Sequence, residues 1–67
     1  MTNDFDPARL AELRKSKGLS QRALAQAAGV SQALIAELES GKHPPIKASL
    51  DKIAGALSIS TGAFASG

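Results

Sequence analysis

Three glycines divide the middle of this chain into short runs of helix-forming residues. Gly18 follows ARLAELRKSK, Gly29 follows QRALAQAA, and Gly41 follows QALIAELES. Glycine enters the left-handed backbone region that ends a helix at little cost, so each of them marks a helix end. Ser20 and Ser31 stand before the second and third runs, where their hydroxyls can cap a new helix. The chain must therefore fold by packing several short helices together.

The first helix is expected to begin after Asp6-Pro7 and to run through ARLAELRKSK. Asp6 can cap its amino end, and proline suits the first helical position because its missing N–H has no intrahelical partner there. Leu10 and Leu13 lie on one face of this helix and are candidates for the core.

The fourth helix is expected roughly over residues 47–58, after a KHPP loop whose prolines exclude helix. Its apolar residues form one stripe at helical spacing, which consists of Ile46, Leu50, Ile53 and Leu57. Ser60 would cap a last short turn, TGAFAS, that carries Phe64. Four or five short helices around one small core predict a compact all-α fold.

The 67 residues are enough for one domain, with residues 1–6 expected as a flexible tail and residues 65–67 as a frayed end. The absence of cysteine excludes disulfides and thiolate metal sites, so the fold must rely on helix packing or on an oligomer partner. No signal peptide is recognisable, and no apolar run approaches the roughly 18 residues that cross a bilayer. We therefore expect a cytoplasmic protein without a membrane partner.

The second and third runs are typical of a helix-turn-helix, because two short helices are joined by a tight turn that contains Gly29. Ala25 is small enough to let the third helix cross close by, and Val30 can be buried directly after the turn. Ile35 and Leu38 would hold the third helix against the core. The helix-turn-helix is therefore expected over residues 20–39, with one face of its second helix free.

The sequence resembles the Cro-and-repressor type of helix-turn-helix DNA-binding domain, the XRE family. The matching features are LR..KGLSQ..LA from residue 13 to 25, GVS at 29–31, I..LE.GK..P at 35–45 and LDKIAGALSIS at 50–60. The resemblance implies a lambda-repressor-like fold of five helices. It also implies that the third helix binds double-stranded DNA, usually as a homodimer on a two-fold operator.

A third helix in the major groove would present its outward residues to base edges, and these are Gln32, Ala33, Ala36 and Glu37. Gln32 can pair with adenine N6 and N7, and Ala33 can contact a thymine methyl. Glu37 can accept from cytosine N4 or can be a charge at the rim. The face carries no arginine to read guanine, so DNA shape is expected to contribute to specificity.

The phosphate-contacting candidates are Ser20, Gln21, Arg22, Lys42, His43 and Lys47. A helix amino end offers free N–H groups to phosphate, which favours Ser20 and Gln21, although Ser20 can also act as a cap alone. Gln21, Lys42 and Lys47 match phosphate-contacting positions of the family. His43 has no second ligand at metal-binding spacing. The alternative interpretation of these side chains is an ordinary solvated surface.

The family pattern also implies an ion pair between the first and third helices, formed here by Arg14 and Glu39. Such a pair would fix the angle of the third helix. Ile59 and Phe64, near the end of the chain, are candidates either for a dimer contact or for the core.

The function expected is a sequence-specific DNA-binding transcriptional regulator, specifically a repressor. Eight basic against four acidic residues between Pro7 and Lys52 fit a polyanionic partner, although the net charge of the chain is only +2. The alternative is a helical protein–protein interaction module, or an antitoxin-like partner protein with little DNA specificity. Paired carboxylates, a nucleophile with its base and a phosphate-cradling glycine loop are all missing, so no enzyme, cofactor, metal or small-molecule ligand is expected.

Overall fold

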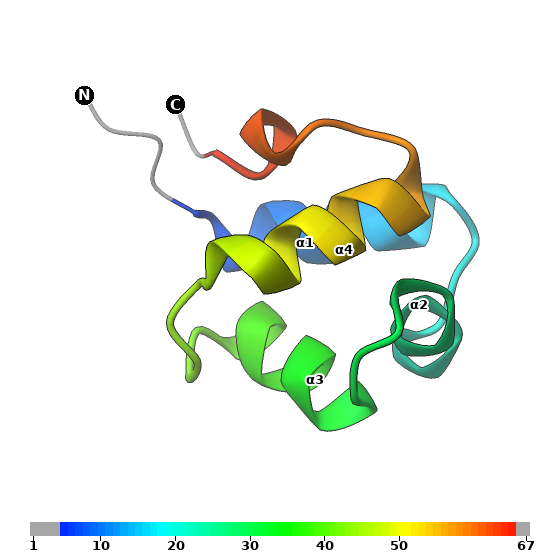
Figure 1. The fold of residues 1–67 in the computed structure, drawn as a ribbon, viewed down its shortest axis with the longest axis horizontal. Coiled ribbons are helices and arrows are strands. Elements are labelled where there is room, and N and C mark those ends of the chain that lie inside the picture. The colour runs from blue at the N-terminus through cyan, green and yellow to red at the C-terminus, as the bar shows by residue number, and fades with distance from the viewer. Residues whose placement is uncertain (1–4, 66–67) are drawn as a thin grey trace.

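A computed structural model describes residues 5–65, which form four α-helices and one 3₁₀ helix (Figure 1). In chain order these are α1 (Pro7–Ser16), α2 (Gln21–Ala28), α3 (Gln32–Ser40), α4 (Lys47–Leu57) and η1 (Thr61–Phe64). The expected all-α fold of four to five helices is confirmed, and the observed bounds agree closely with the segments expected from the glycines and serines.

Side-chain caps explain where the first three helices begin. The Asp6 carboxylate accepts from the Ala8 amide at 3.0 Å. The Ser20 and Ser31 hydroxyls each accept from the amide three residues later, at 3.0 and 3.1 Å. Each bond satisfies one of the amides that a helix start leaves without an intrahelical partner.

The helix ends follow the glycines. Gly29 and Gly41 terminate α2 and α3 with φ of +73° and +79°, and Gly18, just after α1, has φ +72°. At the end of α4 a serine takes this role, because Ser58 has φ +59°. L-residues with a Cβ are strained in this region, so Ser58 is an unusual helix terminator.

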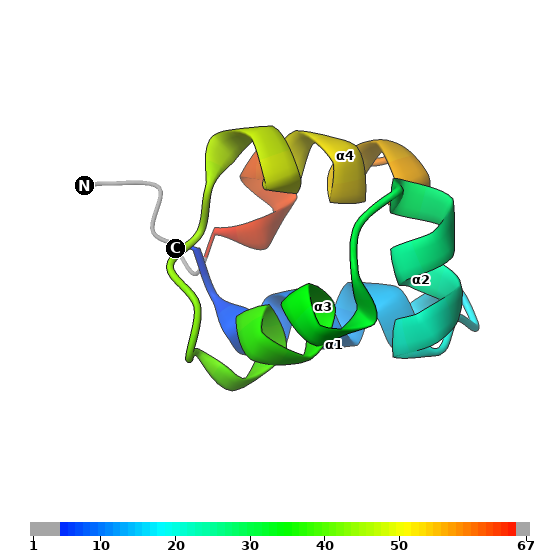
Figure 2. The same ribbon diagram turned by 60° about the horizontal axis from the view of Figure 1, so that its bottom comes forward.

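The helices enclose one apolar core (Figures 1 and 2). In both views α2 lies at one end of the molecule, where it packs against α3 and α4, while α1 packs against α3 and η1. The largest fully buried side chains come from every helix and are Leu10, Leu24, Ile35, Leu38, Ile53, Leu57 and Phe64.

The expected apolar stripe of the fourth helix is wrong at its first position. Ile46 precedes α4 as its N-cap residue, in an extended backbone conformation, and is 49% exposed. Because the helix begins only at Lys47, helical spacing does not carry Ile46 onto the face of Ile53 and Leu57, which are both buried. Leu50 is half-buried beside them.

Two residues of the expected N-terminal tail are packed instead. The Asp6 amide donates to the Phe64 carbonyl at 2.8 Å, and Phe5 forms an isolated antiparallel bridge with Ala65. Phe64 is 1% exposed, so it belongs to the core and is not available as a dimer contact; Ile59 is half-buried against the same core. The other residues of the expected tail and frayed end, 1–4 and 66–67, lie outside the described residues.

Candidate nucleic-acid interface

The connection between α2 and α3 is short and hydrogen-bonded. Gly29 turns the chain in the left-handed conformation, and the Val30 amide then donates back to the Ala25 carbonyl at 3.0 Å. Ala25 is buried, as expected for the small residue that lets the two helices approach. The turn therefore sets the angle between α2 and α3.

One side of α3 is anchored and the other is free. Ile35 and Leu38 are fully buried, and Leu34 is half-buried against the core. Of the four candidates for base contact, Gln32, Ala33 and Glu37 are exposed, whereas Ala36 is half-buried. The exposed face of α3 therefore starts at the capped amino end of the helix and extends over about one turn, with Ala36 at its margin.

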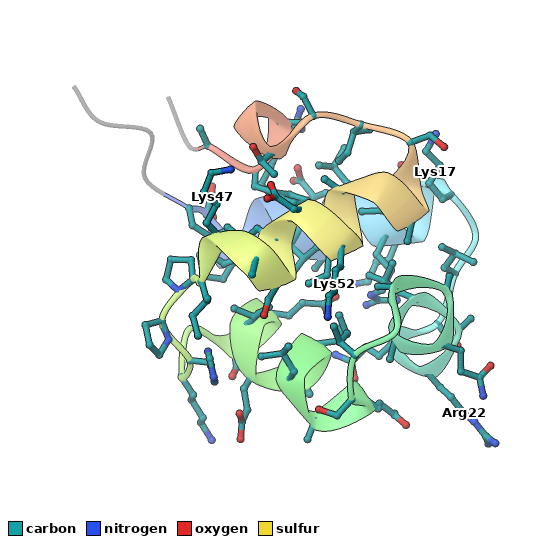
Figure 3. All side chains as sticks on the ribbon, viewed as in Figure 1. Lys17, Arg22, Lys47 and Lys52 are labelled. Carbon is teal, nitrogen blue, oxygen red and sulfur yellow. The ribbon has the colours of Figure 1, made fainter. Side chains whose placement is uncertain are left out.

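The amino end of α2 carries the next group of candidates. The Ser20 hydroxyl is occupied by its cap, while the amides of Gln21 and Arg22 have no intrahelical acceptor. These amides and the helix dipole give this end a partial positive charge. Arg22 is exposed, and its side chain extends away from the helices (Figure 3).

The two candidates directly after α3, Lys42 and His43, differ in their exposure. Lys42 is exposed, and its amide donates to the Glu37 carbonyl at 2.9 Å as part of the end of α3. His43 is half-buried, with its Nδ1 2.7 Å from the carbonyl oxygen of the following proline. The loop thus holds both residues directly beyond the end of α3.

Lys47 is not brought together with the other candidates. Its side chain lies on the side of α4 that faces away from α3 (Figure 3). There its Nζ is 3.3 Å from a carboxylate oxygen of Asp51, one helical turn further along. The side chain also lines a shallow depression next to Phe5 and Thr61. The first turn of α4 therefore directs Lys47 toward η1.

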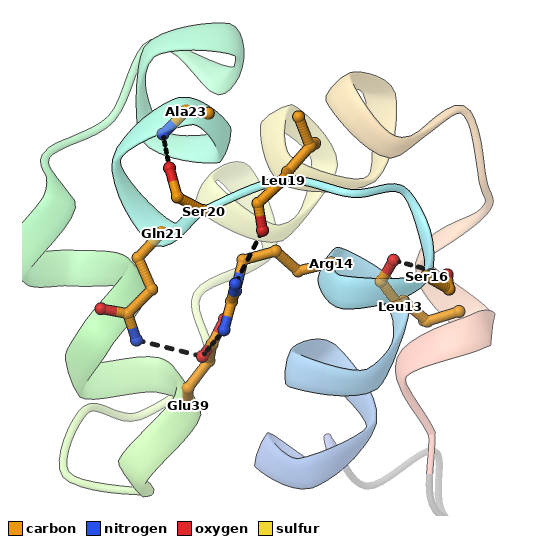
Figure 4. Close-up of polar contacts among 8 residues, drawn as sticks. All are labelled: Leu13, Arg14, Ser16, Leu19, Ser20, Gln21, Ala23 and Glu39. Carbon is orange, nitrogen blue, oxygen red and sulfur yellow. Dashed lines mark hydrogen bonds and ion pairs between the residues drawn. The ribbon is translucent and has the colours of Figure 1, made fainter.

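Arg14, on α1, contacts both α3 and the residue before the cap of α2 (Figure 4). Its Nε and Nη2 donate to the two carboxylate oxygens of Glu39 at 2.6 and 3.1 Å, so the expected ion pair between α1 and α3 is present. Its Nη1 donates to the Leu19 carbonyl at 2.7 Å, directly before the cap of α2. The Arg14 and Glu39 side chains are only 10% and 8% exposed.

The hydrogen bonds from Arg14 to Glu39 raise the pKa of the guanidinium, against the opposing effect of its burial. Arg14 therefore remains a cation next to Glu39. A bidentate pair of this kind has a defined geometry as well as a charge interaction. It fixes the start of α2 and the carboxyl-terminal half of α3 relative to α1.

Gln21 is a further member of this cluster that the sequence did not predict. The Nε2 of Gln21 donates to Oε1 of Glu39 at 3.1 Å, so this carboxylate oxygen accepts from both Arg14 and Gln21. The contact joins residues 18 positions apart, on different helices. No local pattern indicates it, because it depends on the angle at which α2 meets α3.

Metal and membrane sites are not found in the part of the chain that the structure describes. Residues 5–65 contain no group of three His, Asp or Glu side chains that could hold a metal ion. None of their helices has the length and apolar character needed to cross a bilayer.

The profile of the HTH_3 family, described as helix-turn-helix, matches residues 10–64. The chain belongs to this family. This membership confirms the helix-turn-helix family that the resemblance in the sequence indicated. No curated protein matches the chain.

Solved structures agree with this membership. An HTH_3-family transcriptional regulator from Vibrio cholerae is 46% identical with a TM-score of 0.82, over 87% of this chain and 33% of its own. This chain thus spans about a third of that regulator. The restriction-modification controller protein C.AhdI from Aeromonas hydrophila is 34% identical with a TM-score of 0.84, over 87% of this chain and 88% of its own.

The DNA-binding domain of the P22 c2 repressor is 28% identical with a TM-score of 0.79, over 91% of this chain and 80% of its own. This similarity confirms the repressor-like fold that was expected from the sequence.

Proposed function

We propose that this chain is a sequence-specific repressor that binds a two-fold DNA operator as a homodimer, with α3 in the major groove. The observation that carries the proposal is the exposed face of α3. A helix that is anchored by Ile35 and Leu38 on one side and exposed on the other can enter a groove without disrupting the packing of the core. Since solved relatives come from bacteria, whose DNA lies in the cytoplasm, we propose that compartment for the protein.

Base reading is assigned to the exposed side chains of α3. Gln32 stands at the first position of the helix and carries both a donor and an acceptor, which suits adenine in the major groove. Ala33 would contact a thymine methyl group, Glu37 would accept from cytosine, and Ala36 would approach from the margin. With two alanines among four readers, the sequence-dependent shape of the DNA would supply much of the specificity.

Backbone contacts are assigned to the start of α2 and to the loop after α3. The free amides at the start of α2 would receive one phosphate, together with Gln21 and Arg22. Lys42 and His43 would approach the backbone beyond the end of α3. Lys47 is left out of this set because it points away from α3 and pairs with Asp51.

A homodimer follows from the small size of the reading face. One copy of α3 covers few base pairs, and a second copy doubles the contacts and reads a symmetric site. The relatives named above support the regulatory role through their printed descriptions as a transcriptional regulator, a controller protein and a repressor.

The second candidate is a helical protein–protein interaction module. It is favoured by the short reading face with its two alanines and by the net charge of only +2. Salt dependence separates the two candidates, because phosphate contacts release counterions and make log affinity fall linearly with log salt concentration. A titration on random-sequence duplex DNA should give such a line for the repressor. Absence of binding at low salt would favour the interaction module.

Selection of bound duplexes from a random pool would then identify the operator. A palindromic consensus is the expected result for a homodimer, and an asymmetric consensus would contradict the two-fold arrangement.

A further inference from the structure

Glu39 accepts hydrogen bonds from two side chains, Arg14 and Gln21, whose surroundings differ. Arg14 is enclosed between α1 and α3 and has its remaining bond to the Leu19 carbonyl. Gln21 is half-buried at the first position of α2, beside amides that have no intrahelical acceptor. The carboxylate therefore connects the interior of the molecule to the end of α2 that faces outward.

A carboxylate can accept hydrogen bonds but cannot donate them, so it fixes which end of a glutamine amide it contacts. Figure 4 shows the Nε2 of Gln21 directed to Glu39 and the carbonyl oxygen directed away from it. An amide nitrogen carries two hydrogens, and Glu39 uses one of them. The second remains for another acceptor, and a phosphate oxygen is an acceptor only.

A glutamine without this contact can rotate its amide and present either end to the DNA. If the amide oxygen faced a phosphate, two acceptors would lie opposite each other and no hydrogen bond could form between them. Arg14 also makes the approach of a phosphate more favourable. Its guanidinium neutralises Glu39 and lowers the repulsion between that carboxylate and the phosphate.

We infer that Glu39 is a positioning residue for DNA binding, which holds the amide of Gln21 with its donor end ready for a backbone phosphate at the start of α2. Glu39 itself does not touch the DNA. This inference rests on the proposed function, and it deepens it by assigning a task to the buried ion pair besides holding α1 and α3 together.

A mutant cycle on random-sequence duplex DNA at low salt tests the inference. Gln21→Ala is made in the wild-type protein and in an Arg14→Met/Glu39→Met background, where an apolar pair of similar volume replaces the buried ions. In the wild type, loss of one charge-assisted bond should weaken binding about tenfold. In the second background the loss should fall to about twofold or less, because the two sites are coupled.

Gln26→Ala is the matched control, since Gln26 is an exposed glutamine on the same helix. It should leave binding unchanged in both backgrounds. If the double Met variant does not fold, Glu39→Gln replaces it as the second background, since this change keeps the shape of the side chain and removes its charge. The loss caused by Gln21→Ala should shrink there too.

Equal losses in the two backgrounds would overturn the inference and leave the proposed function intact. A Gln21→Ala protein that binds like the wild type would overturn the inference and would also remove Gln21 from the proposed phosphate contacts. A wild type that binds no DNA would overturn both. A proton–nitrogen correlation NMR spectrum of the free protein gives an independent check. The side-chain amide protons of Gln21 should be shifted relative to those of Gln26, and coincident shifts would contradict the hydrogen bond to Glu39.

Discussion

The ring of Phe5 meets the ring of Phe64 edge to face, with centroids 5.9 Å apart and planes inclined by 69°. This contact joins the segment before α1 to the last residue of η1. Next to it, the Asp6 amide donates to the Phe64 carbonyl at 2.8 Å. The beginning and the end of the described chain thus close the core together, and the stability of the helix-turn-helix depends on both.

Replacing Phe64 by Leu should lower the free energy of unfolding by about 1 kcal/mol, because an edge-to-face pair contributes roughly 0.5–1.5 kcal/mol beyond the buried area. Thermal or urea unfolding measures the change. Phe5→Leu should cost a similar amount in the wild type and little more once Phe64 is Leu. Fully additive losses would show that the two rings do not interact.

Glu39→Ala should be strongly destabilising. It leaves the Arg14 guanidinium, which is almost fully enclosed, without its counterion, and removing one partner of a buried pair costs about 3–5 kcal/mol. In a domain of this size that is a large part of the total stability. The melting temperature and the DNA affinity should both fall. A melting temperature equal to that of the wild type would contradict the structural role of the pair.

Local signals in the sequence were sufficient for most of the fold. Ser20, Ser31 and the glycines after the first three helices act within a few residues, so their positions predict the helix bounds directly. Ile46 was misassigned because its side chain fits the helical period while the α4 backbone begins one residue later. Periodicity alone does not indicate where a helix begins when no side chain caps its amino end.

The candidate site was predictable to a smaller degree. The exposed face of α3 follows from the burial of Ile35 and Leu38, which periodicity gives. The Arg14–Glu39 pair was expected only through resemblance to a family. The contact of Gln21 with Glu39 and the direction of Lys47 depend on how helices cross, which no short stretch of sequence encodes.

Gly29 and Ser58 form a matched pair for testing backbone strain, since both have positive φ at the end of a helix. Gly29→Ala should lower the free energy of unfolding by about 1 kcal/mol, the cost of a Cβ in the left-handed region. An added Cβ there meets no atom within 4 Å, so no clash contributes.

Ser58→Gly should have the opposite effect and raise the free energy of unfolding by up to about 1 kcal/mol, because it relieves the same strain. Urea unfolding of both variants measures the two changes. Changes of the same sign in the two variants would contradict strain as their common cause.

Lys42→Gln should lower the salt dependence of DNA binding. If Lys42 neutralises one phosphate, the slope of log affinity against log salt concentration should decrease by about one. Lys17→Gln is the control, because Lys17 carries the same charge on the side of the molecule away from α3 (Figure 3). Equal changes in slope for the two variants would indicate a general charge effect rather than a contact at the end of α3.

Gln32→Ala should change specificity more than overall affinity. On the operator obtained by selection, loss of a bidentate contact should cost about 1–3 kcal/mol and relax the preference at one base pair of each half-site. On random-sequence duplex DNA the affinity should stay nearly constant, because the phosphate contacts of α2 and Lys42 remain. The two binding constants measured side by side therefore separate base reading from backbone contact. A similar loss on both duplexes would mean that Gln32 does not read a base.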